Sequence, residues 1–369
     1  MTVATESAES YAQALIGGAD FVDRAVFLAL GDRSVRIRAN SSAMLDRLRR
    51  YFSTFVCAPA PADIDVLVVE RDPVELGVEF IDWKREPGKS KRRKDSYRDF
   101  PGGRLVRKVR TGMLFLQSLD ACVAAGPCLR NDNQVINFIN SQYMNWLQQR
   151  GWLICHAAGI VCQGRALGIA GFSGGGKSTL MLHLLGNSGS AYLTNDRLFV
   201  KRAGDGMRAA GIPKLPRVNP GTILHNPQLH ALIPADQRER LAQLPRDELW
   251  DLEQKYDVMV DEVYGQDRIV SEAPLAAFVI LDWQRDDDAP LRVEQVDLAR
   301  RHDLLQAVMK SPGPFYQYAD GHMFEADATL GEQAYIDVFS DVAVYAVSGG
   351  LDFAGVVPHL EALMGCGHA

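Results

Sequence analysis

The sequence has none of the features that mark a secreted, membrane-spanning or metal-clustered protein. Its six cysteines form no C-x-x-C pair and no regular ligand spacing, which argues against a zinc site and predicts reduced thiols in a chain of 369 residues. No apolar run approaches about 18 residues, so we expect no membrane span. Glu6 and Glu9 stand where a signal peptide would need positive charge. We therefore expect a soluble, cytoplasmic protein with no membrane partner. The cysteines are Cys57, Cys122, Cys128, Cys155, Cys162 and Cys366.

The sequence also lacks an excess of basic charge. Its 40 lysines and arginines face 46 acidic residues, and the net charge of -6 argues against a general nucleic-acid-binding protein. Hydrophobic residues make up 47% of the chain and charged residues 23%, a balance typical of globular proteins with a substantial core. At roughly 100–200 residues per domain, the length predicts about two domains.

The N-terminal part of the chain is typical of a small α+β domain without catalytic residues. Alternating apolar residues predict paired strands in FVDRAVFLAL (21–30) and RSVRIRA (33–39), with turn residues between them. Ser41 or Ser42 is placed to cap a helix with one apolar face, and a further strand follows at 64–69.

A long helix marks the predicted domain boundary. Asn131 or Asp132 caps a helix that runs through Arg150, because apolar side chains repeat there at helical spacing. We expect this helix to lead into the second domain, which gives domains at 1–130 and 131–369.

Residues 84–110, here called the basic island, differ in charge from the rest of the chain. They hold twelve basic and three acidic side chains, a net charge of +9, so the other 342 residues sum to -15. Pro87 and Gly88 predict a loop in the first half, and RLVRKVR (104–110) alternates like a strand with one charged face. Two interpretations stay open: a solvated loop and hairpin, or a docking surface for an acidic protein or a nucleic acid.

One motif carries specific chemistry. Residues 171–178, GFSGGGKS, match the phosphate-loop pattern G-x-x-x-x-G-K-[ST] at every position. Glycines allow the backbone N–H groups to turn toward a phosphate, and the positive end of the next helix adds to the attraction. Lys177 supplies a charge for the outer phosphates, and Ser178 supplies a hydroxyl for Mg²⁺. An apolar strand (165–170) precedes the loop and an amphipathic helix (177–186) follows it. The sequence therefore predicts nucleoside triphosphate binding, the alternative being a glycine-rich turn that binds nothing.

Three further side chains are candidates for this site. A strand over 191–194 ends in Asn195-Asp196, and a carboxylate at the C-terminal end of a strand beside the loop points into the nucleotide crevice. His156 precedes the hairpin that leads into the loop. Asp282 ends another apolar strand and has the form of a Walker B acid. We favour Asp196 over Asp282 as the metal-side acid, because a tryptophan and a charged stretch follow Asp282 and indicate a solvated loop.

Here the chain resembles the HPr kinase/phosphorylase family, whose fold is shared with phosphoenolpyruvate carboxykinase. That family has a histidine, a β-hairpin, a glycine loop ending in G-K-S, a helix, and an apolar strand closing on an aspartate pair. The matching features are His156, the phosphate loop and Leu193-Thr194-Asn195-Asp196, within a continuous match over 152–202. The ending VAVYAVSGGLDFAGVVPHLEAL also looks like the last strand and helix of the group. The resemblance is to the branch called HPr kinase-related kinase B. It implies an α/β fold with a P-loop kinase core of the HPr kinase/phosphoenolpyruvate carboxykinase type and a small N-terminal α+β domain.

The resemblance implies an ATP-dependent kinase that transfers the γ-phosphoryl group to a hydroxyl, which in this family belongs to a protein serine. It implies ATP and Mg²⁺ as cofactors, with Lys177, Asp196 and His156 in catalytic roles. Ser178 and Asp196 are then the metal-side residues, and Asp196 orients the acceptor together with His156. The nucleotide-binding residues expected are Gly171, Ser173, Gly174, Gly175, Gly176, Lys177, Ser178 and Thr179.

Two departures from the family pattern bear on the mechanism. Asn195 replaces one aspartate of the pair, so a single carboxylate serves both the metal and the acceptor or abandons one of these roles. The signature segment that the family carries after the core is not reproduced either, which leaves HPr itself open as the substrate.

Other functions stay open on the sequence alone. One is a small-molecule kinase on the same fold, and another is a nucleotide-dependent regulatory ATPase without an acceptor. The basic island favours an acidic protein as the phosphoacceptor, because a small metabolite needs no extended patch. Lys214 and Arg217, in a proline-rich segment, are either a phosphoryl clamp or exposed surface residues. A homo-oligomer is compatible with the sequence, and the choice of ATP over GTP rests on the family alone.

Overall fold

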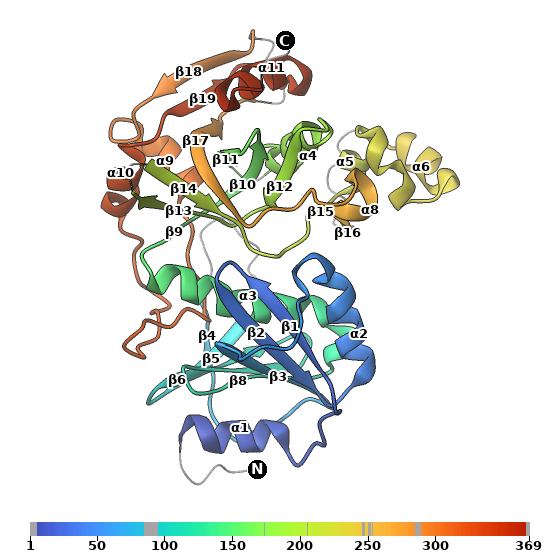
Figure 1. The fold of residues 1–369 in the computed structure, drawn as a ribbon, viewed down its shortest axis with the longest axis vertical. Helices are drawn as coiled ribbons and strands as arrows, with labels where there is room; N and C mark the ends of the chain where they lie inside the picture. The colour runs from blue at the N-terminus through green and yellow to red at the C-terminus, as the bar shows by residue number, and fades with distance from the viewer. Residues whose placement is uncertain are drawn as a thin grey trace. The chain divides into compact units, whose positions relative to one another are not determined.

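The computed structural model describes residues 6–84, 95–172, 174–204, 206–245, 248–249, 252, 254–284 and 289–366 (Figure 1). The chain forms two compact units. The first comprises Met1–Gly151 and Ser311–Thr329, and the second comprises Trp152–Lys310 and Leu330–Ala369. This division differs from the expected boundary at residue 130, because the long helix and a distant segment of the chain both pack within the first unit.

The first unit is built on an eight-stranded sheet with the order β1-β2-β3-β8-β7-β6-β5-β4. Strands β2, β3 and β8 are parallel neighbours, and the remaining neighbours are antiparallel. The predicted pairing of the first two strands is confirmed. The strands are β1 (Ala25–Leu30), β2 (Arg33–Ala39), β3 (Ile64–Glu70), β4 (Ile81–Asp82), β5 (Asp95–Phe100), β6 (Gly103–Lys108), β7 (Met113–Ser118) and β8 (Cys122–Gly126).

Helices cover both faces of this sheet. Side chains alternate along a strand, so Leu114 and Leu116 of β7 pack in the core under α1, whereas Phe115 contacts Phe138 of α3. Helices α1 and α3 accordingly lie on opposite sides of the sheet (Figure 1). The helical segments are α1 (Ala8–Ile16), α2 (Ser42–Tyr51), η1 (Ser53–Phe55), η2 (Cys128–Arg130) and α3 (Asp132–Gln149).

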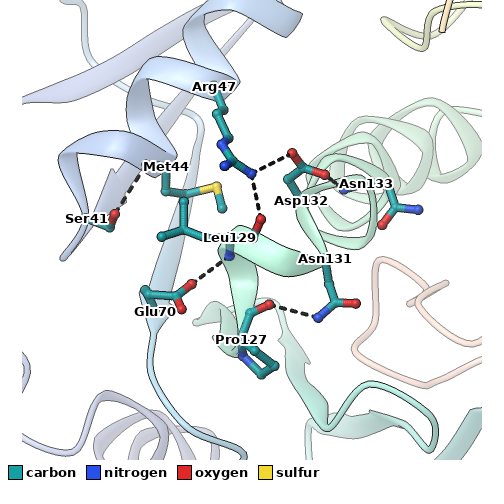
Figure 2. Close-up of polar contacts among 9 residues, drawn as sticks. All are labelled: Ser41, Met44, Arg47, Glu70, Pro127, Leu129, Asn131, Asp132 and Asn133. Atoms are coloured by element: carbon teal, nitrogen blue, oxygen red, sulfur yellow. Dashed lines mark hydrogen bonds and ion pairs between the residues drawn. The ribbon is translucent and has the colours of Figure 1, made fainter. Parts of the chain in front are cut away.

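Polar contacts fix the start of α3 to the rest of the first unit (Figure 2). The Arg47 guanidinium of α2 donates to the Leu129 carbonyl at 2.6 Å and pairs with Asp132 at 3.3 Å. The Leu129 amide donates to the Glu70 carboxylate of β3 at 2.6 Å. The predicted cap of α2 is confirmed at Ser41, whose hydroxyl accepts from the Met44 amide. These contacts join α3 to α2 and β3, which explains its place in the first unit.

The segment 311–329 completes the first unit although it is distant in sequence. Its Phe315 ring lies against Phe115 and Phe138, with ring centroids 5.5 and 5.2 Å apart. The side-chain amide of Asn145 on α3 donates to the Phe315 carbonyl at 2.8 Å. Gln317 is fully buried and donates to the Gly102 carbonyl at 3.1 Å. The first unit therefore draws part of its core from chain that follows most of the second unit.

Arg104 of the basic island holds this segment from inside the unit. The expected strand is confirmed as β6, but Arg104 does not lie on a charged outer face, because only 1% of it is exposed. Its guanidinium pairs with Asp99 and donates to the Phe324 carbonyl at 2.9 Å. A buried cation has to be paired in this way to offset its lost hydration. Lys89 to Lys94 of the basic island lie outside the described residues.

The second unit contains a nine-stranded sheet. Its main path runs β12-β10-β11-β17-β14-β13-β9, and β19 pairs with β17 and β18. Strands β15 and β16 form a separate pair. The strands are β9 (Leu153–Cys155), β10 (Ala157–Cys162), β11 (Arg165–Gly171), β12 (Ser190–Thr194), β13 (Leu198–Ala203), β14 (Gly206–Ala210), β15 (Arg217–Val218), β16 (Tyr256–Asp257), β17 (Glu272–Leu281), β18 (Arg292–Val296) and β19 (Val344–Ser348).

The central strands of this sheet are buried on both faces, which explains their nearly continuous apolar sequences. Ala166 and Ala170 of β11 lie in the core that α9 and α10 complete. Leu167 and Ile169 alternate with them and are also fully buried, and α4 and α11 pack on the same strand. The helical segments are α4 (Lys177–Leu185), α5 (Pro220–Leu224), η3 (Pro227–Leu232), α6 (Ala235–Ala242), α8 (Val260–Tyr264), α9 (His302–Val308), α10 (Glu332–Phe339) and α11 (Phe353–Met364).

The C-terminal helix α11 is fastened to the sheet by a covalent bond. Cys162 at the end of β10 and Cys366 after α11 form a disulfide, with their Cα atoms 6.4 Å apart. The expectation of six reduced thiols is therefore wrong for these two cysteines. Sequence spacing gave no sign of the pair, because 204 residues separate its members. Asn187, just after α4, also donates to Glu361 of α11 at 2.9 Å.

Among the residues that the structure describes, no helix combines the length and the apolar character that crossing a membrane requires.

We predict that Phe315→Ala destabilises the first unit by about 3–5 kcal/mol, the usual cost of removing a buried aromatic ring. The measurement is urea denaturation followed by circular dichroism. Tyr318→Ala is the matched control on the same segment, because 42% of Tyr318 is exposed, and it should cost about 1 kcal/mol or less. An equal loss in the free energy of unfolding from the two variants would contradict the conclusion that segment 311–329 contributes to the core of the first unit.

Candidate active site

Strand register brings three candidate groups to one edge of the second sheet. Ala157 of β10 pairs with Ala170 of β11, so His156 stands opposite the start of the phosphate loop at Gly171. Strand β12 pairs with the other side of β10 and ends at Thr194, and Asp196 follows two residues later. The edge therefore carries, in order, Asp196, His156 and the phosphate loop.

The phosphate loop has the backbone that its glycines were expected to provide. Gly174 and Gly176 have φ values of 80° and 84°, in the left-handed region that residues other than glycine rarely occupy. The Gly175 amide donates to the Phe172 carbonyl at 3.0 Å and closes the turn. Helix α4 begins at Lys177, with Gly176 as its N-cap. Ser173 lies outside the described residues.

Lys177 lies across the loop rather than out in solvent. Its ammonium donates to the carbonyls of Gly171 and Phe172 at 2.6 and 3.2 Å. Burial lowers the pKa of Lys177 to about 8, against the opposing attraction of Asp196. A desolvated ammonium of this kind is stabilised by an anion, because a phosphate replaces the lost hydration with a charge-assisted hydrogen bond.

Two aromatic residues contact the loop and support its backbone. No sequence pattern predicts this role for either of them. The Trp283 indole donates to the Gly175 carbonyl at 2.9 Å. Phe353 at the start of α11 packs edge-on against Trp283, with ring centroids 5.1 Å apart. A Cβ atom at Gly176 would lie 2.8 Å from the Phe353 ring, so only glycine fits there. The sequence predicts that Trp283 begins a solvated loop, but only 6% of this side chain is exposed.

Asp196 is the most strongly perturbed acid of this edge. Burial alone would raise the pKa of Asp196, but Arg197, Lys214, Lys310 and His156 together lower it to about 2. The Lys214 ammonium lies 3.6 Å from one carboxylate oxygen. The other oxygen, Oδ1, is buried and has no hydrogen-bond partner among the described residues, and the same holds for Asn195 Oδ1. A buried oxygen without a protein partner is commonly satisfied by a water molecule or an ion, or has a catalytic role.

Lys310 also belongs to this edge, and no sequence signal singled it out. It follows α9, and its charge acts on both Lys177 and Asp196. The His156 amide donates to the Val308 carbonyl at 2.7 Å, which places the segment that carries Lys310 beside the histidine. A lone lysine after a short amphipathic helix has no motif, so only the fold reveals this placement.

The two cations of the proline-rich segment have different surroundings. The Lys214 ammonium pairs with Asp196, so this residue is not a solvated surface lysine. Arg217 on β15 pairs instead with Asp257 on β16 at 2.9 Å, and its guanidinium is partly exposed. The structure therefore brings Lys214 into the candidate site and gives Arg217 a partner in a small separate sheet.

Asp282 ends at the same sheet edge but on the other side of the loop. It follows Leu281, which pairs with Gly171 across β17 and β11. Its carboxylate lies 3.6 Å from the Arg301 guanidinium, and burial raises the pKa of Asp282. Arg301 in turn pairs with Asp303 at 2.7 Å. Asp282 thus lies in a polar cluster with its own cation, whereas Asp196 keeps one buried oxygen unpaired.

The residues present fit a magnesium ion only in company with phosphates. No group of three or more histidine, cysteine or acidic side chains that could hold a metal occurs in the described part of the chain. Asp196 offers one unpartnered buried oxygen, and Ser178 is the second residue of α4. Mg²⁺ usually takes one or two protein ligands and completes its shell with water and substrate phosphates. Thr179 of the predicted loop set lies with its hydroxyl 3.0 Å from that of Thr222.

No family model matches this chain, and no curated protein matches it. Among solved structures, the chain is similar to the HPr(Ser) kinase/phosphatase from Coxiella burnetii, at 12% sequence identity. The similarity covers 57% of this chain and 87% of that chain, with a TM-score of 0.27.

We predict that Lys177→Ala removes the stabilisation of the protein by Mg-ATP and leaves the fold intact. A ligand at about 100 times its Kd stabilises the native state by about 2.7 kcal/mol, which thermal melting with and without Mg-ATP detects. Lys84→Ala, at an exposed lysine of the first unit, is the control and should respond like the wild type. Equal stabilisation of Lys177→Ala and wild type would contradict the assignment.

Proposed function

We propose that this protein is an ATP-dependent kinase that transfers the γ-phosphoryl group to a hydroxyl acceptor. The observation that carries the proposal is the register of β10, β11 and β12, which brings a complete phosphate-loop sequence and Asp196 to the same sheet edge. A phosphate loop by itself is compatible with nucleotide binding only, whereas an ionised acid beside it provides a group that can orient an acceptor.

The charge of this edge supports an anionic ligand. Four basic side chains act on the single carboxylate of Asp196 or on one another there. Burial lowers the pKa values of Lys177 and Lys214 to about 8, so their charges are held at a cost in hydration. A nucleoside triphosphate would relieve this cost by pairing with the ammonium groups. The four basic residues are Lys177, Arg197, Lys214 and Lys310.

The proposed mechanism relies on positioning and charge neutralisation, because phosphoryl transfer requires little covalent chemistry from the protein. The backbone amides of Gly174 to Lys177 bind the β-phosphate, and the Lys177 ammonium exchanges its loop carbonyls for β- and γ-phosphate oxygens. Ser178 and Asp196 would hold Mg²⁺, which neutralises phosphate charge when bound.

Asp196 orients the acceptor hydroxyl in line with the γ-phosphorus. Its pKa of about 2 keeps it ionised at neutral pH, so it accepts a hydrogen bond from the hydroxyl and takes the proton late in the transfer. His156 stands between Asp196 and the loop in the strand order, and its charge acts on Asp196. Asn195, in place of a second carboxylate, leaves Asp196 as the acid that serves both roles.

The acceptor in this proposal is a protein serine. The resemblance of residues 152–202 to the HPr kinase pattern supports this choice, and the +9 charge of the basic island supports an acidic protein. Incubation with labelled ATP and a cell extract, followed by identification of the labelled species, tests the acceptor class. A labelled small molecule would replace the protein acceptor, and ATP hydrolysis without any labelled acceptor would replace the kinase with a regulatory ATPase.

We predict that Asp196→Asn lowers the rate of phosphoryl transfer by about 10² or more, because a positioned base alone contributes about 10²–10⁴. Asp282→Asn is the matched control, since its carboxylate also ends a strand at this edge but pairs with Arg301. It should change the rate by a much smaller factor. If Asp282→Asn is the more damaging change, the metal-side acid is Asp282 and the Asp196 assignment is wrong.

A further inference from the structure

Two segments that are distant in sequence meet beside the phosphate loop. One runs through β9 to His156, and the other runs from the end of α9 to Lys310. Cys155 and Met309 form an antiparallel bridge, and the His156 amide donates to the Val308 carbonyl at 2.7 Å. In this antiparallel register Lys310 stands opposite Ile154, two residues before His156.

A buried tyrosine holds these two segments together. Tyr335 of α10 is 3% exposed, and its hydroxyl donates to the Ile154 carbonyl at 2.7 Å. The same hydroxyl accepts from the Lys310 amide at 3.1 Å. A single oxygen thus bridges the backbone just before His156 and the backbone of Lys310 itself. Such a bridge limits the movement of both segments, because breaking it leaves a buried amide and a buried carbonyl without this partner.

The charge of Lys310 acts on two groups of the candidate site. One is Lys177, which binds the loop carbonyls, and the other is Asp196 at the end of β12. Lys310 therefore lies near both the loop lysine and Asp196. In the proposed mechanism the loop amides bind the β-phosphate, so the terminal phosphate would extend from the loop toward Asp196.

We propose that Lys310 is a second phosphate-binding cation of this site, one that contacts the γ-phosphate, and that Tyr335 is its positioning residue. This inference rests on the proposed nucleotide-dependent function and adds a residue to it. Lys177 then neutralises charge from within the loop, and Lys310 does so from the acceptor side. The two lysines together supply the clamp on the transferring group that phosphoryl transfer requires.

Nucleotide affinity tests this assignment without an acceptor. The experiment measures the Kd of Mg-ADP and of a non-hydrolysable ATP analogue for the full-length wild type, Lys310→Met, Lys310→Arg and Tyr335→Phe. Lys310→Met should weaken binding of the ATP analogue about 10-fold or more, because a hydrogen bond to a charged group contributes about that much. Binding of Mg-ADP should change by less than about 2-fold, since ADP lacks the phosphate that Lys310 contacts.

Two conservative variants distinguish direct contact between Lys310 and the phosphate from positioning of Lys310 by Tyr335. Lys310→Arg keeps the charge and should retain most of the analogue affinity. Tyr335→Phe should weaken binding of the ATP analogue, but less than Lys310→Met does. It should leave the affinity for Mg-ADP unchanged. Lys201→Met, at a half-buried lysine of β13 outside the site, should leave both affinities at the wild-type values.

Each outcome decides the inference. Unchanged analogue binding in Lys310→Met would overturn it, and so would equal losses of ADP and analogue, which indicate a structural role. Wild-type protein that binds neither nucleotide would overturn the proposed function and this inference together. Wild-type binding that Lys177→Ala abolishes and Lys310→Met leaves unchanged would overturn the inference alone.

Discussion

The site depends on one constraint, the backbone pairing of β10 with its two neighbours. Because Ala157 pairs with Ala170 and Gly159 with Thr194, the residues just outside the paired region fall at one edge. His156, Gly171 and Asp196 are therefore brought together by main-chain hydrogen bonds rather than by side-chain contacts. A one-residue slip of β12 would exchange Tyr192 and Leu193 between its two faces, and both side chains are buried and differ in shape. Core packing thus fixes the position of Asp196.

The same edge concentrates positive charge, and the buried ammonium groups lose hydration there. Burial lowers the pKa values of Lys177 and Lys214 to about 8, which means that each ammonium loses hydration in the folded protein. Asp196 offsets part of this loss, and its own pKa falls to about 2 in return. The loop itself rests on Trp283 and Phe353, so its backbone is held in shape before any anion arrives. Charge and rigidity together favour an anionic ligand.

Local patterns in the sequence predicted the elements of the site but not their mutual support. The phosphate loop, the strand before it and Asp196 each have a signal within about ten residues, because glycine content and apolar alternation are local properties. Lys310, Tyr335 and Phe353 have no such signal, since their roles arise from contacts with residues far away in the chain. The disulfide of Cys162 with Cys366 and the burial of Arg104 were missed for the same reason. Long-range pairing decides these features, and one sequence does not display it.

Lys310 is the last residue of the second unit before the chain enters the first unit. The next residue, Ser311, begins the segment that completes the core of the first unit, where Phe315 packs on Phe115 and Phe138. The preceding residue, Met309, follows α9 and forms a bridge with Cys155 of β9 in the second unit. The Tyr335 hydroxyl accepts a hydrogen bond from the Lys310 amide and donates one to the Ile154 carbonyl. These two hydrogen bonds join the backbone of Lys310 to that of Ile154 within the second unit, so the position of Lys310 rests on a buried side chain of α10 rather than on its neighbours in sequence.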